Sequence, residues 1–348
     1  MGAHRAADIR SICRSRPPPD VFSIVMATGI VSIAAFGHSY WRIASGLEVV
    51  ASAVYVLLVL GFVVRTATQP ERALRPTADP DVALRMFTFV AACAVLASCW
   101  QAHPVAERVL GGLALAAWLP LISLAVVLVR ARPLTELRDQ AHGAWLLPTV
   151  ATQGLSITAA DLTAQGCPAW LLVVAGAGWL FGVLLYPLVL TLIAWRTAAG
   201  SLRSEIVTPD SWILMGALAI TTLAGSTILR VARLLHVPSS LTWWIAHVGA
   251  LAPWSAATLW IPPLLYAAVW QANKHPGSLR NSRAWWSAVF PIGMYSAATS
   301  ATATELDIPA LYTVSLVFFW IAFVAWSAVA FGLLRHAPHR RNCQSAIH

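Results

Sequence analysis

The chain has 348 residues, of which 58% are apolar and 11% are charged, and its formal net charge is +9. Soluble globular chains average about 45–50% apolar and about 25% charged residues. So few charges cannot cover the surface of a soluble chain of this length, which excludes a disordered chain, a nucleic-acid-binding module and an ordinary cytosolic enzyme.

Ten stretches are apolar and long enough to approach the roughly 20 residues with which a helix crosses a bilayer. Each is expected to be helical, because a backbone in lipid must satisfy its own hydrogen bonds. The predicted spans are 22–38, 47–64, 84–102, 109–129, 145–160, 169–195, 212–235, 241–270, 285–304 and 310–334. The sequence therefore predicts an all-α integral membrane protein, with a ten-helix domain at 21–335 between an N-terminal segment at 1–20 and a C-terminal tail at 336–348.

The connections between the predicted spans alternate between short and long, which is typical of five helical hairpins joined by longer links. Of the 23 basic residues, 19 fall on the side that holds both termini and the long links. Basic residues favour the cytoplasmic side of a membrane, so we expect a multi-pass plasma-membrane protein with both termini in the cytoplasm. The basic excess then reports topology, and no nucleic-acid partner is expected.

Hydroxyl side chains are concentrated in alternate spans. The odd-numbered spans hold 19 Ser and Thr in 96 residues, and the even-numbered spans hold 9 in 121. This asymmetry predicts five polar helices around a central path, with five apolar partners facing the lipid bilayer. Small and hydroxyl residues also let membrane helices pack closely, which is the competing explanation for any single pair. The candidates for lining the path are Thr28, Gly29, Ser32, Thr149, Thr152, Ser156, Thr222, Ser226, Gly293, Ala297, Ser300 and Thr304.

Two prolines, Pro148 and Pro291, lie in odd-numbered spans and predict helix kinks there. The other chemistry-bearing residues of the spans are few. Glu48 is the single carboxylate within them, and we find no catalytic constellation, no metal-ligand pattern and no cofactor motif. Three arginines near span ends, Arg85, Arg230 and Arg233, either snorkel to the interface or line a pore mouth.

A path rich in hydroxyls and poor in carboxylates suits a small anion, which neutral donors can solvate without trapping. Cation pathways and proton relays usually need intramembrane Asp or Glu. A proton-coupled solute carrier remains the alternative in the same class. A polytopic membrane enzyme is the alternative from another class, and it would need polar catalytic residues at one interface.

Three segments resemble the tellurite-resistance/C4-dicarboxylate transporter family, which includes plant slow anion channels and fungal malate permeases. They are the first span from Phe22 (FSIVMATGIVSIA), the start of the fifth from Trp145 (WLLPTV) and the ninth from Trp285 (WWSAVFPIGMYS). The resemblance implies a quasi-fivefold array of five hairpins around a pore that the odd-numbered helices line. It also implies a homotrimer with one pore in each subunit.

The same resemblance assigns a role to Phe290. By residue type alone this side chain would be an ordinary core aromatic, but family members place a Phe in the ninth helix as a plug across the pore. The resemblance further implies a small-anion substrate: a C4-dicarboxylate such as malate, or an oxyanion such as tellurite or sulfite. No cofactor is expected.

Overall fold

The computed structural model describes residues 20–68, 79–199, 209–237, 249, 251–274 and 285–336, and every regular element within these ranges is helical. The predicted segments at 1–20 and 336–348 lie almost wholly outside the described residues.

The long helices fall into two groups that alternate along the chain. The inner helices are α2 (Ser23–Gly37), α6 (Phe87–Cys99), α9 (Leu147–Ala164), α11 (Ile213–Leu234) and α14 (Trp286–Leu306). The outer helices are α3 (Trp41–Thr68), α7 (Pro104–Arg130), α10 (Trp170–Ala199), α13 (Ala252–Lys274) and α15 (Pro309–His336). The short helices are α5 (Pro80–Arg85), α8 (Leu134–Gln140), η1 (Gly143–Leu146) and η2 (Pro209–Trp212).

Each predicted span overlaps one of these helices, with three differences in detail. The third span is divided into α5 and α6 at Met86, the link at 130–144 contains α8 and η1, and the eighth span begins among residues outside the described ranges. Several helices also run past the predicted spans, because a helix can continue into the interface with a polar sequence. Glu107, Asp161 and Glu305 are in helices for this reason.

Six helical segments of the described part are long and apolar enough to cross a membrane, and their burial separates the two groups. In α3, α7, α10 and α15 only 11–22% of the most apolar window is buried within the protein. The segments that contain α6 and α11 are 67% and 89% buried. The alternation in hydroxyl content along the sequence therefore corresponds to an alternation between buried and exposed helices.

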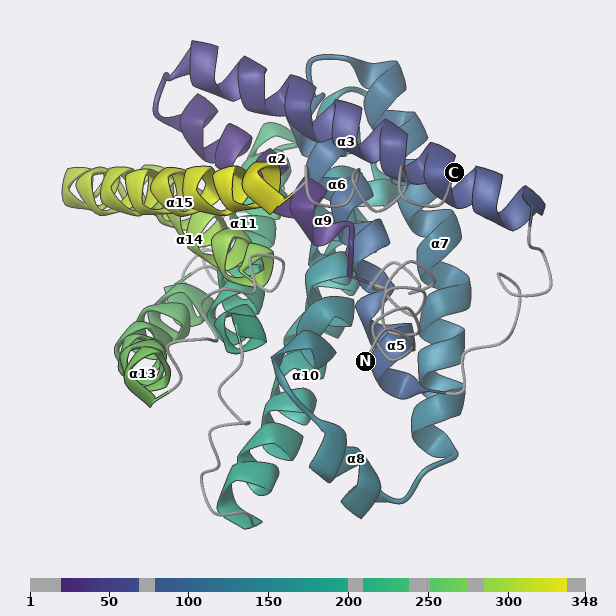
Figure 1. The fold of residues 1–348 in the computed structure, drawn as a ribbon. Helices are drawn as coiled ribbons and strands as arrows, with labels where there is room; N and C mark the ends of the chain where they lie inside the picture. The colour runs from purple at the N-terminus through teal and green to yellow at the C-terminus, as the bar shows by residue number, and fades with distance from the viewer. Residues whose placement is uncertain are drawn as a thin grey trace, which may run out of the picture.

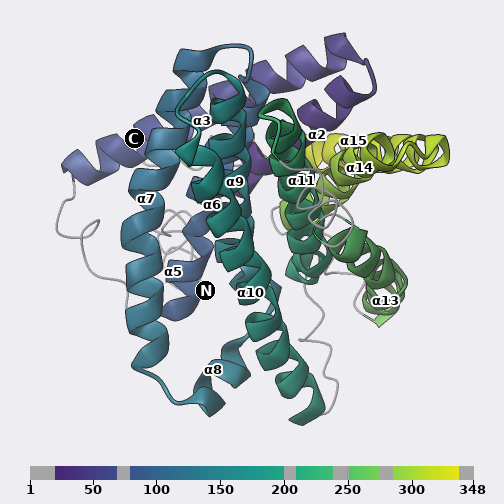
Figure 2. The same ribbon diagram turned by 180° about the vertical axis from the view of Figure 1, so that it is seen from behind.

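The inner helices contact one another in a closed order. Helix α2 packs on α6, α6 on α9, α9 on α11, α11 on α14, and α14 returns to α2. Each outer helix packs on the inner helix that precedes it in the chain. Helices α3, α7, α13 and α15 lie at the edges of the ribbon in both views (Figures 1 and 2). The five hairpins are therefore arranged around the protein in the order in which they occur in the chain.

Each outer helix also places at least one aromatic polar group against the inner helix of the next hairpin. The indole N–H groups donate over 2.9–3.1 Å, and the Tyr55 hydroxyl lies 3.2 Å from the Cys93 sulfur. In chain order the pairs are Tyr55 with Cys93, Trp118 with Thr152, Trp179 with the carbonyl of Thr221, Trp254 with Thr299, and Trp326 with Thr28. The last pair joins the fifth hairpin to the first and closes the series.

We expect Trp118→Phe to destabilise the protein by about 1–2 kcal/mol, because it removes the bond to Thr152 and part of a packed ring. Trp170→Phe is the matched control, since that side chain is 61% exposed. Unfolding of both variants would be followed in detergent micelles. Equal stability of the two variants would contradict a structural role for the Trp118 bond.

Candidate functional site

A small cavity lies where the N-terminal ends of the inner helices meet, and we call it the mouth cavity. All five inner helices place a residue of their first turn in its wall. These residues are Ser23 of α2, Thr88 of α6, Leu147 of α9, Ile213 of α11 and Ser287 of α14. The positive ends of five helix dipoles therefore converge on one small space.

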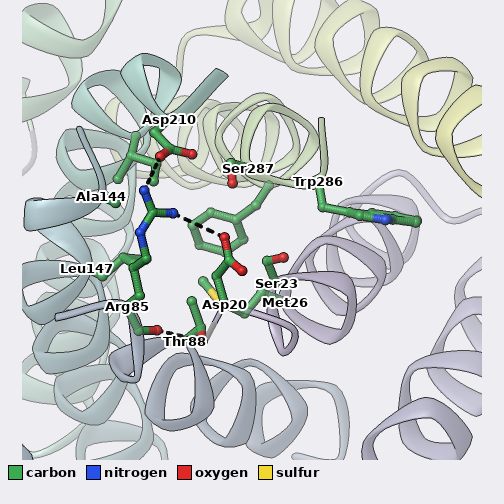
Figure 3. A pocket seen from close by; sticks show the side chains of 12 residues that line it. Asp20, Ser23, Met26, Arg85, Thr88, Ala144, Leu147, Asp210, Trp286 and Ser287 are labelled. Atoms are coloured by element: carbon green, nitrogen blue, oxygen red, sulfur yellow. Dashed lines mark hydrogen bonds and ion pairs between the residues drawn. The ribbon is translucent and has the colours of Figure 1, made fainter. Parts of the chain in front are cut away.

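The guanidinium of Arg85 reaches into this cavity, where it binds Asp20 and Asp210 (Figure 3). It also binds Asp81, so that each nitrogen contacts one carboxylate. Nε lies 2.9 Å from Asp81, Nη1 lies 3.1 Å from Asp20, and Nη2 lies 3.0 Å from Asp210. The Arg85 side chain is 20% exposed. Each of its three nitrogens thus has one protein carboxylate as a partner.

His142 extends this network by a second bond to Asp81. Its Nε2 lies 2.7 Å from Asp81 Oδ1, and its Nδ1 accepts a hydrogen bond from the backbone N–H of Ala144. An acceptor at Nδ1 places the proton on Nε2 in neutral histidine. We call Arg85, Asp20, Asp81, Asp210 and His142 the arginine cluster; with His142 neutral it carries one positive and three negative formal charges.

The members of the arginine cluster come from segments that precede four inner helices. Asp20 precedes α2, Asp81 and Arg85 belong to α5 before α6, His142 precedes η1 and α9, and Asp210 belongs to η2 before α11. The cluster therefore ties the same ends of four helices together. Among the described residues, no group that titrates as an acid or base joins it from α14. No set of His, Cys, Asp and Glu in the described part is arranged to hold a metal ion.

Glycine makes the close approach of two of these segments possible. A Cβ built on Gly143 would overlap the backbone carbonyl of Asp210, so η1 and η2 touch backbone to backbone at this point. Asp79 caps α5 through the N–H of Asp81, and Pro80 supplies a fixed φ for its first turn. These local features set the positions of Asp81, His142 and Asp210 around Arg85.

Phe290 lines the mouth cavity and is 3% exposed. Its helix, α14, packs closely against α11 and α2, and a glycine allows the close approach at each contact. A Cβ on Gly216 of α11 would lie 2.9 Å from the ring of Pro291, and one on Gly293 would lie 3.0 Å from Ile30 of α2. The backbone that follows Phe290 is therefore held closely between α11 and α2, and the ring lines the cavity.

Four hydroxyl candidates from the sequence lie at contacts between helices. Thr28 and Thr152 accept the indole bonds from outer helices described above, and Ser32 donates to the carbonyl of Ala44 over 2.7 Å. Ser156 faces Gly178 of α10, where an added Cβ would lie 2.6 Å from the Ser156 oxygen. Helix packing accounts for the placement of these four side chains.

The other buried hydroxyl candidates make no hydrogen bond to another helix among the described residues. Thr149 and Ser226 are buried, and their hydroxyls have no hydrogen-bond partner among the described residues. Thr222 donates only to a carbonyl of its own helix, that of Leu218. Ala297 is buried and Ser300 is half-buried on α14. Buried hydroxyls without protein partners are available to water or an anion.

For three further candidates, neighbouring structure explains the residue type. Gly29 faces Val95 of α6, where a Cβ would lie 2.6 Å from a methyl group, so this glycine serves a close helix contact. Thr304 is exposed and bonds within α14 and to Tyr312. Pro148 is in the first turn of α9, where proline removes no helical hydrogen bond, so it marks the start of the helix; Pro291 lies inside α14.

Arg230 and Arg233, at the opposite end of α11, each bind a carboxylate on a neighbouring inner helix. Arg230 lies 2.7 Å from Asp161 of α9, and Arg233 lies 2.6 Å from Glu305 of α14. Both arginine side chains are 51% exposed. They are ion-pair partners between helix ends rather than isolated snorkelling side chains.

Asp20, Asp81, His142 and Asp210 are site residues that reasoning from the sequence missed. A signal for them exists, because each lies within three residues of the start of an odd-numbered predicted span. That position is where an acidic group interacts favourably with a helix N-terminus. Their convergence on Arg85 could not be read from the chain, since the partners are up to 125 residues apart.

The buried helices, the exposed apolar helices around them and the shared cavity define a multi-pass helical membrane protein. Residues 16–334 match the voltage-dependent anion channel family (SLAC1). The chain belongs to this family, which confirms the resemblance drawn from the sequence motifs and places it among anion channels and transporters.

Two curated relatives come from Mycobacterium tuberculosis: the uncharacterized membrane proteins MT1776, of strain CDC 1551 / Oshkosh, and Rv1735c, of strain ATCC 25618 / H37Rv. Each is 31% identical to this chain over 153 residues, which cover 44% of this chain and 76% of the relative. The chain is therefore similar to other membrane proteins over part of its length.

We expect Gly143→Ala to destabilise the protein by about 1–3 kcal/mol, because the new methyl group would overlap the Asp210 carbonyl. Gly112→Ala, in α7, is the control, since nothing lies within 4 Å of the added Cβ. It should be neutral or slightly stabilising in a helix. The comparison would be made by thermal unfolding in detergent, and a Gly143→Ala variant as stable as Gly112→Ala would refute the backbone contact.

Proposed function

We propose that the protein conducts small anions along a central path between its inner helices, which five hairpins surround in a quasi-fivefold array. The observation that carries this proposal is the convergence of all five inner helices on one cavity that also holds Arg85 and Phe290. Helix N-termini and an arginine attract anions. The unpartnered hydroxyls of Thr149 and Ser226 support a polar route beyond the cavity.

Phe290 is the proposed gate of this path. An aromatic ring in a narrow passage excludes water and ions, and a hydrophobic constriction also closes by dewetting. Its burial at the wall of the mouth cavity supports this role. Pro291 sits against Gly216 and helps to fix the backbone from which the ring projects.

C4-dicarboxylates such as malate, and small oxyanions such as tellurite or sulfite, are the proposed substrates. The three carboxylates around Arg85 support this choice, since a dicarboxylate offers the guanidinium the same chemistry. The assembly proposed by family analogy is a homotrimer in the plasma membrane.

The primary test is the Phe290→Ala variant, which should raise anion flux several-fold over wild type in liposomes, per folded protein. Phe290→Leu should give an intermediate value if occlusion follows side-chain size. A ring that only packs the core predicts no gain in flux per folded protein, while its truncation costs about 3–5 kcal/mol and lowers the yield of folded protein.

Flux would be measured with a panel of malate, sulfite and chloride at fixed membrane potential. Unchanged or lower flux from well-assembled Phe290→Ala protein would remove Phe290 from the gate. Transport that occurs only under an imposed proton gradient would favour the proton-coupled carrier.

The orientation is a separate prediction. With both termini in the cytoplasm, the mouth cavity faces the cytoplasm and the Arg230–Asp161 pair faces the outside. Single cysteines introduced at Asp139 and Asp307 in a cysteine-free background should differ in intact cells. A membrane-impermeant thiol reagent should label the Asp307 position and not the Asp139 position, and the reverse pattern would overturn the orientation.

A further inference from the structure

We propose that the mouth cavity is a carboxylate-binding site in which Arg85 is the ligand-binding residue, and that Asp20 and Asp210 occupy it as internal substitutes for a substrate carboxylate. This inference rests on the proposed anion transport and identifies where the anion first binds. It would make Arg85 the residue that selects planar carboxylates from other anions.

The positive charge around this cavity has to be balanced by negative groups. Five helix N-termini converge there, and each carries a partial positive charge of roughly half a unit. The Arg85 guanidinium adds a full positive charge. Two of the anions that balance this charge, Asp20 and Asp210, line the cavity itself and approach through one oxygen each. The cavity thus already functions as an anion site, filled by the protein.

The three carboxylates differ in what else holds them. Asp81 binds both Arg85 and His142 and is one helical turn away from Arg85 in α5, so it belongs to the framework. The Asp20 side chain is 27% exposed, and among the described residues Arg85 is the side chain that binds it. Asp20 is therefore the carboxylate that a substrate displaces most readily, followed by Asp210.

The opposite wall of the cavity supplies neutral donors. Ser23 and Ser287 line it from α2 and α14, and both are half-buried (Figure 3). Displacement of Asp20 would leave two guanidinium N–H groups facing a dicarboxylate, with hydroxyls within the same cavity. A planar carboxylate matches the fork of a guanidinium, whereas chloride makes a single contact.

The test is malate binding to purified protein, measured by ligand-induced thermal stabilisation in detergent. Asp20→Asn keeps the shape of the side chain and removes its charge, so it should bind malate about tenfold more tightly than wild type at low salt. Asp139→Asn is the matched control, because Asp139 pairs with Arg138 on exposed α8 outside the cavity. Asp210→Asn provides a second variant, with the same expected direction, should Asp20→Asn fail to fold.

Arg85→Lys tests the geometry of the fork, since it retains the charge. It should weaken malate binding about tenfold and change chloride flux far less, measured in liposomes in the Phe290→Ala background. The inference is overturned if Asp20→Asn and Asp210→Asn bind malate no more tightly than Asp139→Asn, or if Arg85→Lys alters malate and chloride equally. An absence of flux in every variant would refute the proposed function, while malate binding would still decide the role of Arg85.

Discussion

The structure depends on hydrogen bonds that join each hairpin to the next. Apolar outer faces gain little by packing on each other in lipid, so helices in a membrane associate through close contacts and interhelical bonds. Here every junction has at least one aromatic donor or acceptor from an outer helix, and the Trp326–Thr28 bond joins the fifth hairpin to the first. The hydrogen bond between His38 and Ser315 and the packing of α15 and α14 on α2 reinforce this last junction.

Closure of this ring creates an electrostatic difficulty that the arginine cluster resolves. Five inner helices in the same orientation bring five positive dipole ends to one place, and these ends repel one another. Asp20, Asp81 and Asp210 supply the opposing negative charge. Arg85 pairs with all three carboxylates, and its positive charge offsets the repulsion between them. If the cavity binds anions as proposed, the charges that stabilise the helix ends would also select the sign of the ligand.

The sequence predicted the helices and the division into inner and outer groups, because hydropathy and hydroxyl content are properties of whole segments. It could not assign individual hydroxyls. Thr28 and Thr152 fit a path-lining pattern as well as a packing pattern, and only the positions of Trp326 and Trp118 distinguish the two. Pro148 was ambiguous for a related reason, since one turn of uncertainty in the start of α9 separates a kink from a helix beginning.

The proposed gate could open while the mouth stays assembled, because of how α14 is placed. The charged groups of the mouth tie α2, α6, α9 and α11 together, and among the described residues α14 contributes no charged side chain to the cavity. A change of the Phe290 rotamer, or a shift of α14 against Gly216, would therefore break none of these ion pairs. In the proposed gate, packing and wetting of the ring would set the free energy of opening. Selection by charge would then belong to Arg85, which lines the same cavity.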